Sequence, residues 1–312
     1  MADKPHILIA GAGIGGLTAA LALLKRGFDI NIYEQAPELQ EIGAGFQVSA
    51  NGTRVFYELG LGDAIEAIAW QPGGKEIRIW NTGQTWKLFD LGAESVERYG
   101  YPYLMFHRGD LHLALADAVR AEKRDAIHLG ATCVGCDQDG SSVRLKIEGQ
   151  DDVVGDVLVA ADGVHSAIRQ TLYGPDDRTF SGLIAWRGVI DKAKLPDEMK
   201  RPVGVNWVGP GGHVVHYFVR NGAMLNIVGI LEKDDWQVES WTAQGTHEEC
   251  LADFEGWHEA IRETFRHVET PFKWALMRRE PMERWTTGRI TLLGDACHPM
   301  VPMLAQGAVM AI

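Results

Sequence analysis

Cysteine is scarce in this chain, which has four in 312 residues. Four cysteines in a chain of this length do not make a disulfide framework, so the sequence favours a reducing, cytoplasmic location. Cys133 and Cys136 form a C-x-x-C pair, the spacing of half a zinc site. The other half is missing because Cys250 and Cys297 are isolated. We therefore expect structural cysteines on a strand and no metal site.

Positive charge is also limited. The chain has 30 Lys and Arg against 42 Asp and Glu, a formal net charge of −12. Without a Lys/Arg-rich run it is poorly suited to gripping a phosphate backbone, so we predict no nucleic-acid partner. The apolar run over residues 7–24 is broken by glycines and follows no basic region. It is read as neither a signal peptide nor a membrane span, and we predict no membrane partner.

Glycine, by contrast, is abundant, with 36 residues. Residues 11–16 match G-x-G-x-x-G. The match follows an apolar strand predicted over 6–10 and opens a helix predicted over 17–25. Glu34 ends the next predicted strand. In this strand–turn–helix context the motif predicts a dinucleotide-binding unit.

Each position of the motif has a physical reason. Gly11 permits the tight turn, Gly13 lets the backbone approach a pyrophosphate, and Gly16 allows the helix to pack closely on the strand. Gly15 lies in the same loop, where the helix N-terminus supplies N–H donors and partial positive charge. Glu34 is placed to accept hydrogen bonds from both hydroxyls of an adenosine ribose. The loop alone leaves NAD and FAD open.

The middle of the chain changes character. Short apolar strands separated by brief turns favour antiparallel neighbours, because a parallel crossover needs a dozen or more residues. The predicted fold class is therefore α/β, a Rossmann-like unit interrupted by an antiparallel sheet with helices. Strands are predicted over residues 143–147, 153–161, 183–190, 203–208, 213–219, 224–231 and 289–293, and helices over 51–59, 110–121 and 247–268.

Three later segments carry a resemblance. The run 160–169, with Asp162 followed by Gly163, resembles the Asp-Gly motif of class A flavoprotein monooxygenases. The run 293–299, with Asp295, resembles their Gly-Asp motif. Arg108 lies in a segment similar to the one whose Arg reaches FAD in that family. Their order spans nearly the whole chain, and the sequence is most similar to salicylate hydroxylases and 3-hydroxybenzoate 6-hydroxylases.

The resemblance implies FAD as cofactor and NADH or NADPH as a transient co-substrate. It also implies a flavin lined by Pro302 and Gly307. Gln40 and Glu41 stand where many relatives carry an Arg, a departure that affects flavin positioning. The implied cofactor-binding residues are Gly11, Gly13, Gly15, Gly16, Glu34, Gly45, Arg108, Asp162, Asp295, Pro302 and Gly307.

The resemblance further implies a division of the chain with a GR2-type Rossmann topology. We expect an FAD-binding domain over 1–180, with small substrate-side segments near 70–105. A substrate domain over 181–275, mainly antiparallel, follows, and 276–312 returns to the FAD-binding domain. Relatives continue beyond such an end, so we expect C-terminal helices to be missing and FAD to be held weakly if the protein ends at residue 312.

The predicted strand 213–219 supplies the substrate side. Period two puts His213 and Tyr217 on one face and His216 on the other, so the two histidines are a poor metal pair. A histidine can take a phenolic proton, and the resemblance favours His213 for this role, with Tyr217 and Pro302 as further catalytic residues. Arg187 is a candidate for neutralising a carboxylate.

The resulting hypothesis is an FAD-dependent aromatic hydroxylase. It would act on a monohydroxybenzoate-type acid with NAD(P)H and O2, through a flavin C4a-hydroperoxide. Three alternatives stay open: a flavin monooxygenase acting on a pyridine or quinolone ring, a reductase of isoprenoid type, and a flavin-binding protein without turnover. The sequence leaves the ring position, the choice of NADH or NADPH, and a homodimer undecided.

Overall fold

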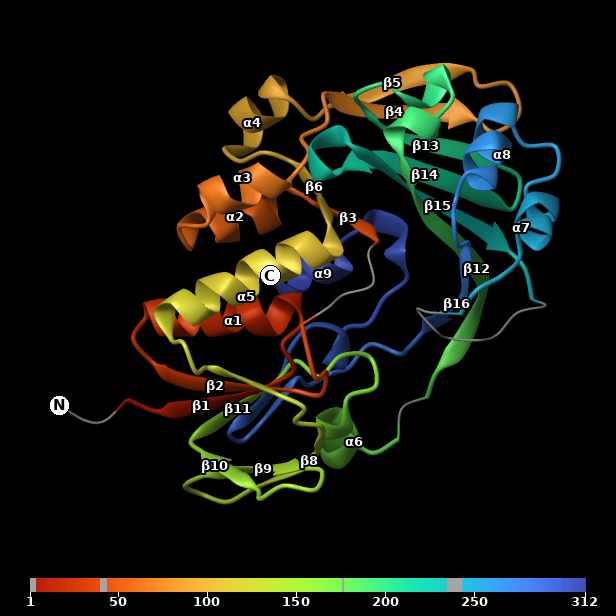
Figure 1. The fold of residues 1–312 in the computed structure, drawn as a ribbon. Coiled ribbons are helices and arrows are strands. Elements are labelled where there is room, and N and C mark those ends of the chain that lie inside the picture. The colour runs from red at the N-terminus through yellow and green to blue at the C-terminus, as the bar shows by residue number, and fades with distance from the viewer. Residues whose placement is uncertain (1–3, 40–43, 176, 235–242) are drawn as a thin grey trace.

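The structure is a computed structural model that describes residues 4–39, 44–175, 177–234 and 243–312. Two main sheets build the chain, and Figure 1 shows them as a lower and an upper half. Helices and strands alternate in the lower half, and the upper sheet is nearly all antiparallel. The predicted α/β class, a Rossmann-like unit interrupted by an antiparallel sheet, is confirmed.

The lower sheet has six strands. Their spatial order is β17 (Thr286–Thr287), β18 (Ile290–Leu292), β11 (Val157–Ala160), β1 (His6–Ala10), β2 (Asp29–Glu34) and β7 (Ile127–Leu129). All neighbours are parallel except β17 and β18. Helices α1 (Ile14–Lys25) and α5 (Arg108–Glu122) pack against each other over this sheet (Figure 1). Strand β1 is apolar because it lies in the middle of the sheet with both faces buried.

The upper sheet has seven strands. Their spatial order is β16 (Phe272–Arg278), β12 (Thr179–Asp191), β15 (Met224–Glu232), β14 (Gly212–Val219), β13 (Gly204–Gly209), β4 (Gly74–Ile79) and β5 (Thr85–Asp90). Every neighbouring pair is antiparallel except β13 and β4. Strands β4 and β5 therefore join a sheet whose other members all begin at Thr179 or later in the chain.

Two smaller sheets and further helices complete the fold. Strands β3 (Gly45–Val48) and β6 (Leu104–His107) form a two-stranded sheet, and β8 (Cys133–Gln138), β9 (Val143–Ile147) and β10 (Val153–Gly155) form a three-stranded one. The remaining helices are α2 (Ala50–Glu58), α3 (Gly62–Ile68), α4 (Ala93–Tyr99), α6 (Ala167–Tyr173), α7 (His247–Asp253), α8 (Glu259–Arg266) and α9 (Gly307–Ala311), with short 3₁₀ turns η1 (Lys192–Lys194), η2 (Asp197–Met199), η3 (Arg220–Gly222), η4 (Gly294–Ala296) and η5 (Pro302–Leu304).

The upper sheet has two differently covered faces. Helices α7 and α8 cover one face, where Trp186 packs with Phe254 and Phe265. The other face turns toward the lower half, and there Tyr217 packs with Met105 of β6. The space between this face and the lower half is the cleft discussed below.

Three predicted elements differ from the structure. The predicted strand 153–161 is two strands in different sheets, broken at Asp156, whose carboxylate accepts a hydrogen bond from the backbone of His6 at 2.7 Å. The predicted helix 247–268 is divided between α7 and α8 because Gly256 has a φ of +77°, which a helix cannot contain, and His258 then caps the start of α8. Strand β16 was missed because the buried Lys273, 5.1 Å from the Trp186 ring, disguises its apolar pattern.

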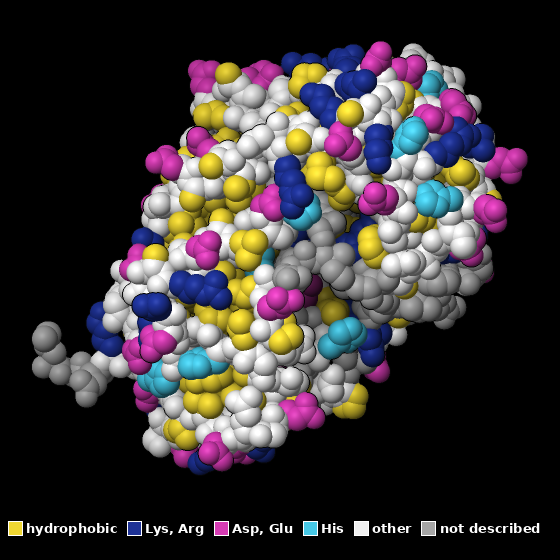
Figure 2. Space-filling view, in the orientation of Figure 1, with side chains coloured by type: hydrophobic (Ala, Val, Ile, Leu, Met, Phe, Trp, Pro, Cys, Tyr) yellow, Lys and Arg dark blue, Asp and Glu magenta, His cyan; other side chains and the backbone are white. Residues whose placement is uncertain are grey.

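The predicted division into 1–180, 181–275 and 276–312 stays a prediction. Within the described residues, no helix has the length and apolar character needed to cross a bilayer. On the face drawn in Figure 2, Lys and Arg side chains are interspersed with Asp and Glu.

Candidate active site

The glycine loop between β1 and α1 has the geometry that its sequence predicts. Gly11 has a φ of +96°, and a side chain there would collide with the carbonyl oxygen of Ala161. A methyl group on Gly16 would overlap the carbonyl oxygen of Gly11. A methyl group on Gly13, in contrast, would meet nothing within 4 Å. The loop is therefore tightly packed on its inner side and open at Gly13, where a ligand can approach the backbone.

Two side chains fix this loop through Ala12, the residue between Gly11 and Gly13. The carboxylate of Glu34 accepts hydrogen bonds from the backbone N–H groups of Ala12, at 2.7 Å, and Ala36, at 2.9 Å. His112 lies on α5, and its Nε2 is 2.6 Å from the carbonyl oxygen of Ala12. The backbone N–H and the carbonyl oxygen of Ala12 are therefore both held by side chains. His112 was missed by sequence reasoning, although its helical spacing from the buried Leu115 and Ala116 could have marked it as inward-facing.

The two later motifs meet beside the loop. Asp162 is half-buried, and burial raises the pKa of its carboxyl group. Its Oδ2 accepts from the backbone N–H of Ile168 at 3.2 Å, while Oδ1 is buried with no hydrogen-bond partner in the described chain. Arg169 reaches the carbonyl oxygen of Ala296 at 3.4 Å and so joins the Asp-Gly motif to the Gly-Asp motif. Asp295 of the Gly-Asp motif is exposed.

Gly45 and Arg108 lie where the lower half meets the upper sheet. The backbone N–H of Arg108 donates to Ala44 at 2.9 Å. The backbone N–H of Gly45 donates to Oδ1 of Asn226 at 2.7 Å, and a methyl group on Gly45 would lie 2.6 Å from the Asn226 side chain. Only glycine therefore allows β3 to approach β15 so closely.

An ion pair fixes the same contact. Arg220, in the turn between β14 and β15, donates to both carboxylate oxygens of Asp110 on α5, at 2.8 and 2.9 Å. Burial works against ionisation of Asp110, but the hydrogen bonds and charges of Arg220 and His107 outweigh it, so the pKa of Asp110 is lowered. The pair ties the upper sheet to the start of α5.

The cleft face of β14 carries the predicted catalytic side chains. Tyr217 belongs to the cluster on the lower-half side, whereas Val214 and Phe218 pack under the helices, as the period-two pattern predicts. His213 is half-buried, and burial lowers its pKa, so its imidazole is neutral at pH 7. Tyr217 is only 4% exposed, and burial raises the pKa of its phenol.

Pro302 and Gly307 lie in the C-terminal segment of the chain. Pro302 begins η5 and is exposed, and Gly307 begins α9. Val301, next to Pro302, packs with Val228 and Trp274 of the upper sheet. The segment therefore runs from the cleft side of the upper sheet to the glycine loop, where a methyl group on Gly15 would lie 3.1 Å from Ala311 of α9.

A cavity of about 320 Å³ opens in the cleft between the two halves. Arg187 is 4% exposed, and its guanidinium lies 5.1 Å from the Phe272 ring and 5.2 Å from the Trp274 ring. Burial and the charge of Arg108 lower the pKa of Arg187 to about 10, so it remains cationic at neutral pH. The lining residues are Ala44, His107, Arg187, Gly188, Val189, Met224, Asn226, Val268, Glu269, Thr270 and Phe272.

Comparison with known proteins assigns the chain to a family. The family described as FAD binding domain matches residues 4–312. A 3-amino-4-hydroxybenzoate 2-monooxygenase of Streptomyces platensis is 38% identical over 310 residues, which are 99% of this chain and 77% of the relative. The chain belongs to the FAD-dependent aromatic monooxygenases.

Two further comparisons agree. A 3-hydroxybenzoate 6-hydroxylase of Polaromonas naphthalenivorans is 36% identical over 316 residues, covering all of this chain and 78% of the relative. The crystal structure of Klebsiella pneumoniae HpxO complexed with FAD and uric acid has a TM-score of 0.85 and 27% identity, with 98% of this chain and 76% of that chain covered.

The residues of this monooxygenase fit FAD. The space at Gly13 and the donors at the start of α1 suit a pyrophosphate, and Glu34 stands at the end of β2, where a ribose is expected. The unpartnered Oδ1 of Asp162 is a free acceptor beside the same loop. The individual roles of Gly15, Gly45, Arg108, Asp295, Pro302 and Gly307 stay predictions, and the departure at Gln40 and Glu41 lies outside the described residues.

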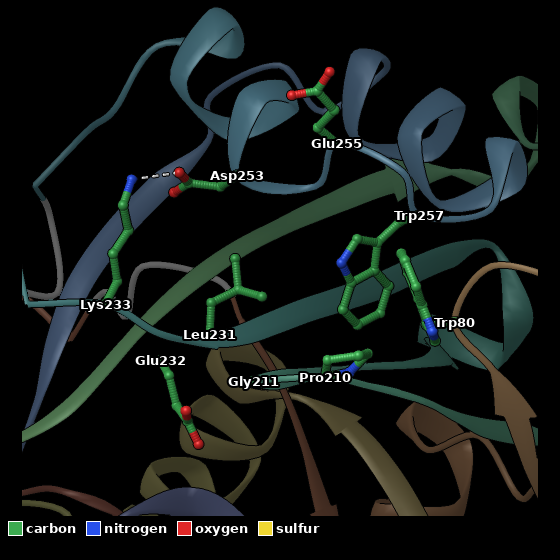
Figure 3. Close-up of a pocket in the computed structure, with 9 residues that line it drawn as sticks. All are labelled: Trp80, Pro210, Gly211, Leu231, Glu232, Lys233, Asp253, Glu255 and Trp257. Atoms are coloured by element: carbon green, nitrogen blue, oxygen red, sulfur yellow. Dashed lines mark hydrogen bonds and ion pairs between the residues drawn. The ribbon is translucent and has the colours of Figure 1, made fainter.

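A second hollow of the monooxygenase lies away from the cleft. Figure 3 shows it between the turn at Gly211 and the segment after α7, with Trp80 and Trp257 at one end and Lys233 paired to Asp253 at 2.6 Å at the other. None of the predicted cofactor or substrate residues lines it. The cleft between the sheets is therefore the candidate active site.

Proposed function

We propose that this monooxygenase hydroxylates a monohydroxybenzoate-type aromatic acid, with NADH or NADPH as reductant and O2 as oxygen source. The carrying observation is that one face of the upper sheet presents both His213, which pairs in register with Ile230, and Arg187, whose guanidinium lies 5.2 Å from the Trp274 ring. An imidazole suits the phenolic hydroxyl of such a substrate, and a guanidinium suits its carboxylate. The names of both reported relatives point to aromatic acids of this kind.

The cofactor supplies the redox chemistry: bound FAD carries electrons from the nicotinamide and activates O2. The chain positions the ring and controls its proton. His213, being neutral, accepts the phenolic proton, and the ionised ring is then richer in electrons ortho and para to the oxygen. Tyr217 follows Val215 on the same face of β14, and Pro302 follows Val301, which packs against that face of the upper sheet.

Apolar side chains keep water from the reacting ring. Val215 of β14 pairs in register with Val228 of β15, and Val301 packs on the same face. Excluding water strengthens the electrostatic interactions of His213 and Arg187 with the substrate and protects reactive oxygen species from wasteful breakdown.

The test is a substrate panel with matched variants. The purified protein, supplied with FAD, NADH or NADPH, and O2, is incubated with 2-, 3- and 4-hydroxybenzoate, and reductant consumption is compared with product mass. We expect a hydroxylated ring from at least one acid. Oxidation of the reductant that yields only hydrogen peroxide with every acid would overturn the proposal.

His213→Gln tests the role of the imidazole. We expect hydroxylation to fall about 10²- to 10⁴-fold, the usual contribution of a general base, while reduction of the flavin by NADH is unchanged. His128→Gln, on β7 of the lower sheet, is the control and should leave both rates as they are. Equal losses in reduction and hydroxylation would show that His213 is structural.

A further inference from the structure

The side chain of Asn226 has a hydrogen-bond donor that no described part of the chain uses. Asn226 is 0% exposed. Its Oδ1 is fixed toward Gly45 because the backbone N–H there needs an acceptor, at 2.7 Å. Its Nδ2 is then buried with no hydrogen-bond partner among the residues that the structure describes. A buried, unpaired donor is costly and rare in folded proteins, and a ligand that accepts from it would remove the cost.

This donor lines the same cavity as Arg187. Both residues border the space of about 320 Å³, which is large enough for a benzoate ring. The other lining side chains near them, Val189, Met224 and Phe272, are apolar. Glu269 is the one carboxylate among the described lining residues, and it is exposed. An amide donor and a buried cation together suit a carboxylate.

The register of the sheet relates this position to His213. Asn226 of β15 pairs with Tyr217 of β14. His213 lies four residues before Tyr217 on β14 and faces the same side of the sheet. At about 3.4 Å per residue, the two positions are about 13 to 14 Å apart along the sheet. Val215 and Val228, which pair with each other, lie between them.

We propose that Asn226, beside Arg187, binds the carboxylate of the substrate while the hydroxyl of the same ring faces His213. The inference rests on the proposed function and deepens it. The hydroxyl and carboxylate oxygens of 3- or 4-hydroxybenzoate are about 5 to 6 Å apart, and two hydrogen bonds of about 3 Å bring the span to about 11 to 12 Å, so the Asn226 and His213 side chains each lean about 1 Å toward the ring. In salicylate the two groups are adjacent, so one ring cannot reach both positions.

The test measures ligand binding to the FAD-loaded protein without reductant. The Kd of 3-hydroxybenzoate, 3-hydroxybenzamide and salicylate is read from the change in flavin absorbance. For the wild type we expect 3-hydroxybenzoate to bind at least tenfold more tightly than the other two. In Asn226→Asp, which keeps the acceptor for Gly45 but loses the donor, we expect the preference for benzoate over benzamide to fall about ten- to hundredfold.

Asn221→Asp is the matched control. Its side chain donates to the carbonyl oxygen of Ala67 in α3, outside the cavity, and the binding preference should not change. The KM for NADH should be unchanged in Asn226→Asp. A raised KM for NADH with an unchanged benzoate preference would show that the donor serves the nicotinamide carboxamide and would overturn the proposal.

Two other results also decide the matter. Salicylate binding as tightly as 3-hydroxybenzoate to the wild type would refute the two-ended arrangement, even if Asn226→Asp does not fold. If the benzoate preference falls in Asn226→Asp but no acid is hydroxylated by the wild type, the carboxylate site stands and the proposed function fails. If acids are hydroxylated and the preference does not fall, this inference alone fails.

Discussion

Gly13 and Gly16 belong to one motif, but the structure gives them different tasks, and a pair of alanine substitutions separates these. In Gly16→Ala the new methyl group overlaps a backbone oxygen at Gly11 and lies 3.3 Å from Ala161, so α1 must move away from β1. Overpacking of this kind costs up to about 3 kcal/mol, and the better helix propensity of alanine returns about 1 kcal/mol. The net loss of about 2 kcal/mol corresponds to a Tm lower by about 4–8 °C.

In Gly13→Ala the methyl group has open space and a φ of −66°, so the fold should keep its Tm within about 1 °C. The same methyl group occupies the approach of the pyrophosphate, so we expect FAD to bind at least tenfold more weakly. Thermal unfolding of the protein stripped of FAD, together with FAD titration, measures both effects. A Gly13→Ala protein that binds FAD normally, or a Gly16→Ala protein with an unchanged Tm, would refute the reasoning.

Three further perturbations test other parts of the site. Glu34→Gln leaves one side-chain oxygen to accept from the backbone N–H groups of Ala12 and Ala36, which now use two, so the Kd for FAD should rise about tenfold. An unchanged Kd would show that these hydrogen bonds do not position the loop for FAD. Asp110→Asn removes an ion pair that contributes about 1 kcal/mol to the free energy of unfolding, so the Tm at pH 7 should fall by about 2–4 °C. Because the pKa of Asp110 is lowered, the contribution of its pair with Arg220 is present above pH 4 and lost in stronger acid, so the two proteins should converge there; a constant difference would contradict this. Burial raises the pKa of Cys133 to about 12 and of Cys136 to about 11, so alkylation of both thiols at pH 8 should be much slower than for a free thiol, and rapid labelling would refute their structural role.

The sequence predicts the nucleotide loop well because that signal is local. Gly11, Gly16 and Glu34 act within one strand–turn–helix–strand unit, and the structure shows the tight turn and close packing that their residue types require. The alternation of His213 and Tyr217 is equally local, since a strand presents every second side chain to the same face.

Other parts of the site depend on contacts that the sequence does not display. His112 reaches Ala12 across 100 positions, and Asn226 reaches Gly45 across 181. Nothing in the local pattern of either residue indicates that partner. The parallel pairing of β4 with β13 is likewise set by packing between distant segments. Contacts of this kind can be identified only from the three-dimensional structure, because their partners are distant in the sequence.

The central claim is that oxygen from O2 enters the ring of an aromatic acid bound in the cleft. The most direct measurement is turnover under ¹⁸O₂ with FAD, NADH or NADPH, and 3-hydroxybenzoate, followed by mass spectrometry of the product. The account predicts one ¹⁸O atom in the new hydroxyl group for each product molecule formed. A product that carries oxygen from water, or reductant consumed with all the labelled oxygen recovered as peroxide, would contradict it.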